Sequence, residues 1–257
     1  MLNLRRLFIT LAAVALSLTA AAPAFASVGF QRLAVPDGNG GTIEAGVWYP
    51  ADAPAAPVNM GLIRPSVAVD APMVGHSLPL VIISHGNGGS FVGHADTAAA
   101  LAEAGFIAVS LTHPGDNYRD QSHATDLPGR PVQLRRLLDY VLTEWPERGR
   151  IDPDRIGAFG FSAGGFTVMA AAGAVVDPER VRDHCRRLPE MFDCKLLAAA
   201  PMKPDPNVGW RRDERIRAVV AAAPGLCGSA PGFDRVAFHA RFNAEVVRFF
   251  REALKVR

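Results

Sequence analysis

The pentapeptide Gly160-Phe161-Ser162-Ala163-Gly164 decides the fold class that this sequence predicts. The apolar run before it, residues 155–161, predicts a buried strand, and the small residues of 164–172 predict a helix. Ser162 then sits on a tight strand-to-helix turn, where a Cβ at either flanking glycine would collide with neighbouring backbone. The pattern makes Ser162 a candidate nucleophile; the alternative is a plain glycine-rich turn.

A second glycine-rich segment, Ser84-His85-Gly86-Asn87-Gly88-Gly89, follows the continuous apolar run 80–84. Such a run is typical of a strand buried on both faces of a parallel sheet. A loop with few bulky side chains lets a backbone N–H approach a substrate oxygen, so the loop is expected to form an oxyanion hole with the N–H of Ala163. The alternative is a glycine-rich loop that binds nothing. The two segments together are more specific than either alone.

The remaining chain alternates between strand and helix patterns. The expected strands are residues 43–49, 80–84, 106–111, 155–161 and 216–223, and the expected helices are 95–104, 132–145, 164–172 and 238–254. This alternation implies right-handed crossovers and a mostly parallel sheet with helices on both faces. Residues 50–79, rich in Pro and Ala, are expected to form a surface excursion. We therefore expect a single α/β domain over residues 27–257.

The N-terminus has the pattern of an export signal. Arg5 and Arg6 precede the apolar run 7–22, and the small residues Ala24 and Ala26 stand where signal peptidase requires them. A membrane anchor is the alternative, but the run is interrupted by hydroxyl side chains and ends at Pro23. Residues 1–26 are thus predicted to be a cleaved signal peptide. The mature chain is expected to be periplasmic or secreted, with no stable membrane anchor.

Charge and motifs exclude several classes of function. The sequence has 27 basic and 25 acidic residues, and the N-terminal 26 residues contribute two arginines and no acid. The balanced remainder argues against nucleic acid as a partner, because binding to its backbone needs clustered uncompensated Lys and Arg. The sequence contains no H-E-x-x-H, C-x-x-C, Walker or G-x-G-x-x-G motif. No metal, nucleotide or other cofactor is therefore expected.

The two glycine-rich segments, with the lead-in at residues 152–156, resemble the α/β-hydrolase fold. The resemblance is strongest to dienelactone-hydrolase-related and platelet-activating-factor-acetylhydrolase-like esterases. It implies an acyl-enzyme on Ser162, oxyanion-hole amides from Asn87 and Ala163, and a small-molecule ester as substrate. It also implies that residues 113–117 lie beside the pocket mouth. Dienelactone hydrolase itself uses a cysteine nucleophile, so the serine favours ester hydrolysis over dienelactone as substrate.

The resemblance also implies that a segment is missing. In this fold the acid and the histidine follow the serine in the chain, on loops after later strands. Here residues 216–223 lead within ten residues to 231–235, which resemble the start of the family's C-terminal helix. The C-terminal strands that carry the triad acid and histidine are therefore expected to be absent.

Several side chains could replace the missing pair. His113 and Asp116 are the best substitutes, because the resemblance places them near the pocket. His184 and His239 are the histidines that follow Ser162, and they are more simply explained as a loop residue beside Asp183 and a residue of an amphipathic helix. His85 is read as structural.

Two rival functions stay open at this point. One is a catalytically impaired, truncated relative of these esterases, so that a weak hydrolase is expected. The other is a non-catalytic exported binding module that uses the bared sheet edge.

Three cysteines are present. Cys185 and Cys194 flank a short polar segment and are expected to form a disulfide, since closing a short loop costs little entropy. Cys227 is then left free. The resemblance implies that its usual partner would lie in the missing stretch.

Overall fold

The computed structural model describes residues 27–126, 128–200, 211–223 and 235–256, without the side chains of 235–240. The predicted signal segment and Cys227 lie outside the described residues. None of the described helices is both long enough and apolar enough to cross a membrane.

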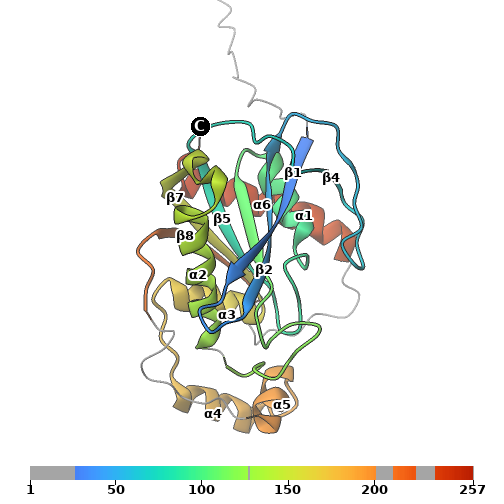
Figure 1. The fold of residues 1–257 in the computed structure, drawn as a ribbon. Helices are drawn as coiled ribbons and strands as arrows, with labels where there is room; N and C mark the ends of the chain where they lie inside the picture. The colour runs from blue at the N-terminus through green and yellow to red at the C-terminus, as the bar shows by residue number, and fades with distance from the viewer. Residues whose placement is uncertain (1–26, 127, 201–210, 224–234, 257) are drawn as a thin grey trace, which may run out of the picture.

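The centre of the protein is an eight-stranded sheet with the order β3-β4-β1-β2-β6-β5-β7-β8 (Figure 1). The strands β6, β5, β7 and β8 run parallel, and β2 joins them antiparallel to β6. The bounds are β1 Ser27–Pro36, β2 Thr42–Ala51, β3 Ala56–Pro57, β4 Ser66–Val69, β5 Leu78–Ser84, β6 Ile107–Leu111, β7 Ile151–Phe161 and β8 Ile216–Ala222.

Helices cover both faces of this sheet. Along β5, Leu80 and Ile82 pack in one core cluster with α2 and α3, whereas Val81 and Ile83 pack in the other with α1 and α6. Successive side chains of a strand point to opposite faces, so both faces of β5 are buried. The helices are α1 Ala95–Glu103, α2 Gly129–Thr143, α3 Ala163–Ala171, α4 Pro178–Arg187, α5 Phe192–Ala199 and α6 Arg235–Ala253, with a 3₁₀ turn η1 at Pro146–Arg150.

The expected strands and helices are present, with ends shifted by a few residues. The expectation for residues 50–79 is wrong in part, because this segment is not confined to the surface. Its strand β4 pairs in parallel with β1, and Met60, Val67 and Met73 are buried. Sequence reasoning missed this contribution because the apolar residues, which lie among many prolines, are spaced too irregularly to form a strand pattern.

The strand β8 lies at the edge of the sheet. Among the described residues it pairs with β7 alone, from Ile156↔Ile216 to Phe161↔Ala222. The chain between β7 and β8 leaves the sheet and forms α4 and α5, which lie at the lower end of the molecule, beyond α3 (Figure 1).

Candidate functional site

Ser162 occupies the turn between β7 and α3 that the sequence predicts. Its backbone has φ 54° and ψ −118°, a conformation that costs a non-glycine residue free energy. A Cβ on Gly160 would lie 2.0 Å from the carbonyl oxygen of Gly164, and a Cβ on Gly164 would lie 1.9 Å from that of Ser84. The backbone segments touch at these two points, so glycine is the residue that fits both.

A cavity of about 540 Å³ opens above this turn. Ser162, Ala163 and Asn87 lie together on its wall, and no hydrogen bond among the described residues uses the backbone N–H of Asn87 or Ala163. The apolar part of the wall consists of Phe161, Phe166, Met191, Phe192, Leu196 and Leu197. Ala124, Thr125, Arg180, Val181, His184, Glu190, Asp193 and Ala223 complete the lining. The cavity thus combines one serine, two neighbouring residues whose amides make no hydrogen bond within the described part of the chain, and a largely apolar surface.

A buried ion pair supports the loop that carries Asn87. Arg130 Nη1 lies 2.5 Å from Asp116 Oδ2, and the two side chains are 2% and 1% exposed. The other carboxylate oxygen of Asp116 accepts hydrogen bonds from Asn87 Nδ2 at 2.7 Å and from the backbone N–H of Gly88 at 2.9 Å. Asp116 therefore fixes the loop from behind rather than facing the cavity.

Arg130 also ties this loop to the helix after Ser162. It donates to the backbone carbonyl of His85 and, at 3.0 Å, to Thr167 Oγ1 on α3. Burial lowers the pKa of Arg130 to about 10, and the charge of Asp116 opposes that shift. The guanidinium therefore stays charged at neutral pH and holds the two glycine-rich segments together.

His85 is locked in one neutral form. Its Nε2 accepts a hydrogen bond from the backbone N–H of His113 at 3.0 Å, so its Nδ1 carries the proton and donates to the carbonyl of Gly86 at 2.6 Å. Burial, followed by the charge of Arg130, lowers the pKa of His85 to about 3. Both nitrogens are occupied, which fits the structural role expected for this residue.

The structure places His113 and Asp116 differently from the expectation that they lie beside the pocket mouth. His113 is fully buried, and neither side chain lines the cavity. The Nδ1 of His113 donates to Gln133 Oε1 at 2.7 Å, and its Nε2 accepts from Ser84 Oγ at 2.8 Å. Burial is also the main cause that lowers the pKa of His113 well below its ordinary value. With both nitrogens engaged, the ring has none left to offer Ser162.

Sequence reasoning missed Arg130, the centre of this network. A signal for it exists, because Arg130 stands four residues before Leu134 and therefore falls on the buried stripe of α2. A charged residue on an apolar helix face indicates a buried partner.

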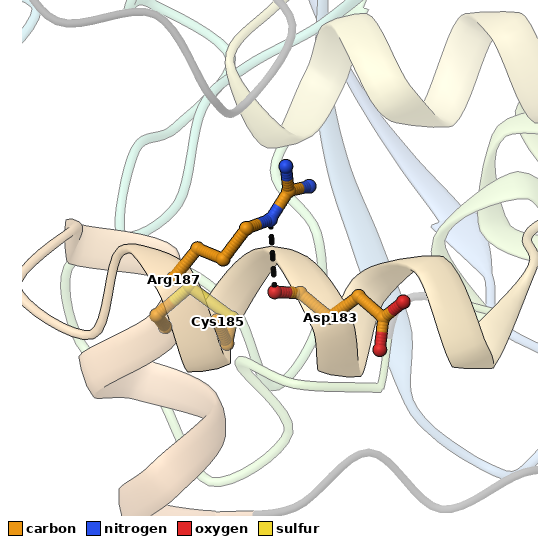
Figure 2. Close-up of a disulfide and its surroundings, with 4 residues drawn as sticks. Asp183, Cys185 and Arg187 are labelled. Carbon is orange, nitrogen blue, oxygen red and sulfur yellow. Dashed lines mark hydrogen bonds between the residues drawn. A yellow bond between two sulfur atoms is a disulfide. The ribbon is translucent and has the colours of Figure 1, made fainter.

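The far wall of the cavity comes from the α4–α5 hairpin, residues 178–199. Its nine lining residues lie between Arg180 and Leu197. A disulfide joins Cys185 on α4 to Cys194 on α5, with 5.2 Å between their Cα atoms, as the sequence predicts (Figure 2). The disulfide therefore links the two helices of the hairpin covalently, directly after the lining residues His184 and Asp193.

This hairpin brings His184 and Asp193 to the cavity. A ring nitrogen of His184 and a carboxylate oxygen of Asp193 lie within 4.8 Å of each other. His184 Nε2 is screened from solvent and has no hydrogen-bond partner among the described residues. The acid next to His184 in the sequence, Asp183, instead pairs with Arg186 and has an exposed side chain.

The same two side chains form a group of possible metal ligands with Cys194 Sγ. Cys194 is oxidised in the disulfide and has no thiolate to offer a metal. The group is thereby reduced to one imidazole and one carboxylate, too few for the four-ligand sites typical of zinc. The side chain of His239, the other histidine after Ser162, lies outside the described residues.

Comparisons with known proteins find a partial sequence match and similar solved structures. No protein-family model matches the chain. A protein of Nocardia uniformis subsp. tsuyamanensis named "Putative esterase NocK" is 32% identical over 105 residues, which are 40% of this chain and 30% of that protein. The match thus spans less than a third of the relative's length.

One solved structure extends the comparison over nearly the whole chain. A ferulic acid esterase from Streptomyces cinnamoneus has a TM-score of 0.54 at 19% identity and covers 93% of both chains. A hyperthermophilic esterase from the archaeon Pyrobaculum calidifontis has a TM-score of 0.45 at 18% identity, over 87% of this chain and 85% of that one. At 19% identity the likeness to the ferulic acid esterase concerns the fold alone, and together with the sheet order it shows an α/β-hydrolase fold.

Proposed function

We propose that the protein is a serine hydrolase that cleaves carboxylic esters through an acyl-enzyme on Ser162. One observation carries the proposal: Ser162 stands on a strained turn at the wall of a cavity that Asn87 and Ala163 also line. A functional residue explains why such backbone strain would be kept, since a strain-free turn would serve packing equally well. The similarity to proteins named as esterases supports the same reaction class.

In this reaction Ser162 Oγ attacks the ester carbonyl carbon, and the carbonyl oxygen becomes negatively charged. The N–H groups of Asn87 and Ala163 donate to that oxygen, and Ala163 also begins α3, whose N-terminus favours negative charge. The bond to the alcohol then breaks and leaves the acyl group on Ser162. Water releases the acid by the same steps.

The lining of the cavity favours small-molecule esters with an apolar acyl or alcohol part. Two phenylalanines, Phe161 and Phe166, flank the serine, and the α4–α5 hairpin adds Phe192 and Leu196. Such a surface gains about 0.8 kcal/mol for each CH₂ group that it takes from water. The reaction needs no cofactor. We also propose that residues 1–26 direct export, so that the mature protein found outside the cytoplasm should begin at Ser27 by intact mass.

Hydrolysis of short-chain p-nitrophenyl esters and labelling by a fluorophosphonate test this function. Both signals should be present in the purified protein and absent from Ser162→Ala. The matched control is Ser122→Ala, at an exposed serine that does not line the cavity. Equal hydrolysis by Ser162→Ala would overturn the proposal. Folded protein that neither hydrolyses esters nor is labelled would favour an impaired relative or an exported binding module.

A further inference from the structure

We propose that His184 is the general base for Ser162 and that Asp193 positions it. The proposal rests on the proposed ester hydrolysis, because it supplies the proton acceptor that this reaction needs. An unassisted serine alcohol is a poor nucleophile and requires an adjacent base. The α4–α5 hairpin is therefore more than a cover over the cavity.

The position of His184 is the first argument. It is the histidine that lines the cavity with Ser162, among those whose side chains the structure describes. His85 and His113 are buried, with both ring nitrogens in hydrogen bonds to other groups. His184 Nε2, by contrast, is screened from solvent without a partner in the described part of the chain. A screened ring nitrogen with no partner is costly unless some state of the protein uses it.

The disulfide is the second argument. Cys185 directly follows His184, and Cys194 directly follows Asp193, so the bond between the sulfurs also fixes the two preceding residues relative to each other. This placement holds a carboxylate within 4.8 Å of the imidazole. Asp193 can then orient the ring and stabilise the imidazolium that forms when His184 takes a proton.

The charges around the pair are compatible with this role. The charged side chains that line the cavity beside Asp193 are Arg180 and Glu190, one of each sign. Asp183 is turned to Arg186, and its backbone carbonyl accepts from Arg187 Nε at 3.3 Å (Figure 2). Asp193, rather than Asp183, is therefore the acid whose carboxylate lies within 4.8 Å of the His184 ring.

Every proton that moves in the proposed ester hydrolysis is accounted for. His184 accepts the Oγ proton while Oγ bonds to the carbonyl carbon, and the π pair moves to the carbonyl oxygen. When that pair returns, the C–O bond to the alcohol breaks, and the leaving oxygen takes the proton from His184. Water then donates a proton to His184 as it attacks the acyl carbon, and Ser162 regains that proton as the acid leaves.

No hydrogen bond among the described residues joins Ser162 Oγ to His184. Hydrogen bonds of catalytic groups are often long without substrate and shorten in the complex. The experiment therefore measures turnover and chemical rescue rather than distance.

The test compares His184→Ala, His184→Gln and Asp193→Asn with the wild type in kcat and KM for a p-nitrophenyl ester. His184→Ala should lower kcat about 100-fold or more with little change in KM, as loss of a general base does. Added imidazole should restore part of the rate in His184→Ala and not in Ser162→Ala. Asp193→Asn should lower kcat less, and His76→Ala, an exposed histidine away from the cavity, should keep the full rate.

Each outcome decides between the two proposals. Hydrolysis that survives Ser162→Ala overturns the proposed function and this inference with it. Hydrolysis that needs Ser162 but is unchanged in His184→Ala and His184→Gln overturns this inference alone. A rate that falls in His184→Ala without rescue by imidazole, in protein whose circular dichroism matches the wild type, also overturns it. A loss on chelation that zinc restores would assign the pair to a metal and overturn it too.

Discussion

Arg130 Nη1 and Asp116 Oδ2 form a 2.5 Å ion pair at the junction of the two glycine-rich segments, buried from water on every side. Asp116 accepts a hydrogen bond from Asn87, and Arg130 donates one to Thr167 on α3. Removing one partner of a buried pair leaves an uncompensated charge, which typically costs about 3–5 kcal/mol of stability.

We therefore expect Arg130→Met to lower the free energy of unfolding by about that amount, measured by urea denaturation. Adding Asp116→Asn to Arg130→Met should restore part of the loss, since it removes the orphan charge. The control is Arg119→Met, which breaks an exposed ion pair with Glu44 and should change stability little. Equal effects of Arg130→Met and Arg119→Met would contradict the role given to the buried pair.

Stability should fall in mild acid because two histidines are held neutral. The pKa of His85 is lowered to about 3 and that of His113 is lowered as well, in both cases by burial first. An unfolded histidine takes up a proton at a pH of about 6.5, so the unfolded state binds protons first as the pH falls. The stabilisation is thus fully present above this value and is lost as the pH falls toward the folded pKa.

The expected loss is up to about 1.4 kcal/mol per pH unit for each of the two histidines. Urea unfolding at a pH of about 7.5 and of about 5.5 measures it. His113→Gln should be less stable at both values, with a smaller difference between them, whereas exposed His76→Gln should keep the wild-type difference. A wild-type stability that is flat between the two values would refute the prediction.

The strained turn at Ser162 predicts an unusual effect of glycine. A residue with φ 54° and ψ −118° bears a cost of about 1–3 kcal/mol that glycine avoids. Ser162→Gly should therefore be more stable than Ser162→Ala by about 1 kcal/mol, although glycine usually destabilises. Thermal melts of the two variants test this. If Ser162→Ala melts at the higher temperature, the turn is not strained in the way described.

Sequence reasoning reached the framework of this site because that framework is local. The buried strand, the Ser162 turn and the next helix lie within 21 residues of chain, from Ile151 to Ala171, and each has its own pattern. Arg130 bonds instead across 46 residues to Ser84 and across 37 to Thr167, and no local pattern encodes such contacts. Sequence reasoning considered His184 only beside its neighbour Asp183 and missed Asp193 for a related reason: the proximity of His184 and Asp193 depends on how a cross-linked hairpin folds.

The apolar cavity predicts a dependence on acyl chain length. Leu196 lies on the cavity wall, so Leu196→Trp fills space that a longer acyl chain would use. We expect kcat/KM for p-nitrophenyl octanoate to fall about tenfold or more, with a smaller fall for the acetate, since each buried CH₂ is worth about 0.8 kcal/mol. Leu62→Trp, at a fully exposed leucine, is the control. Equal losses for both esters would place the acyl chain elsewhere.

The three cysteines predict how many free thiols a titration should find. Cys185 and Cys194 are joined in the structure, and Cys227, outside the described residues, is predicted to carry a free thiol. Titration of unfolded, unreduced protein with a thiol reagent should find one thiol, and three after reduction. Cys185→Ser/Cys194→Ser should lose up to about 3 kcal/mol, because a short unlinked loop regains its freedom in the unfolded state. Cys227→Ser should keep the wild-type stability and show no thiol before reduction. Three thiols in unreduced wild-type protein would contradict the cross-link, and none would mean that Cys227 has found a partner.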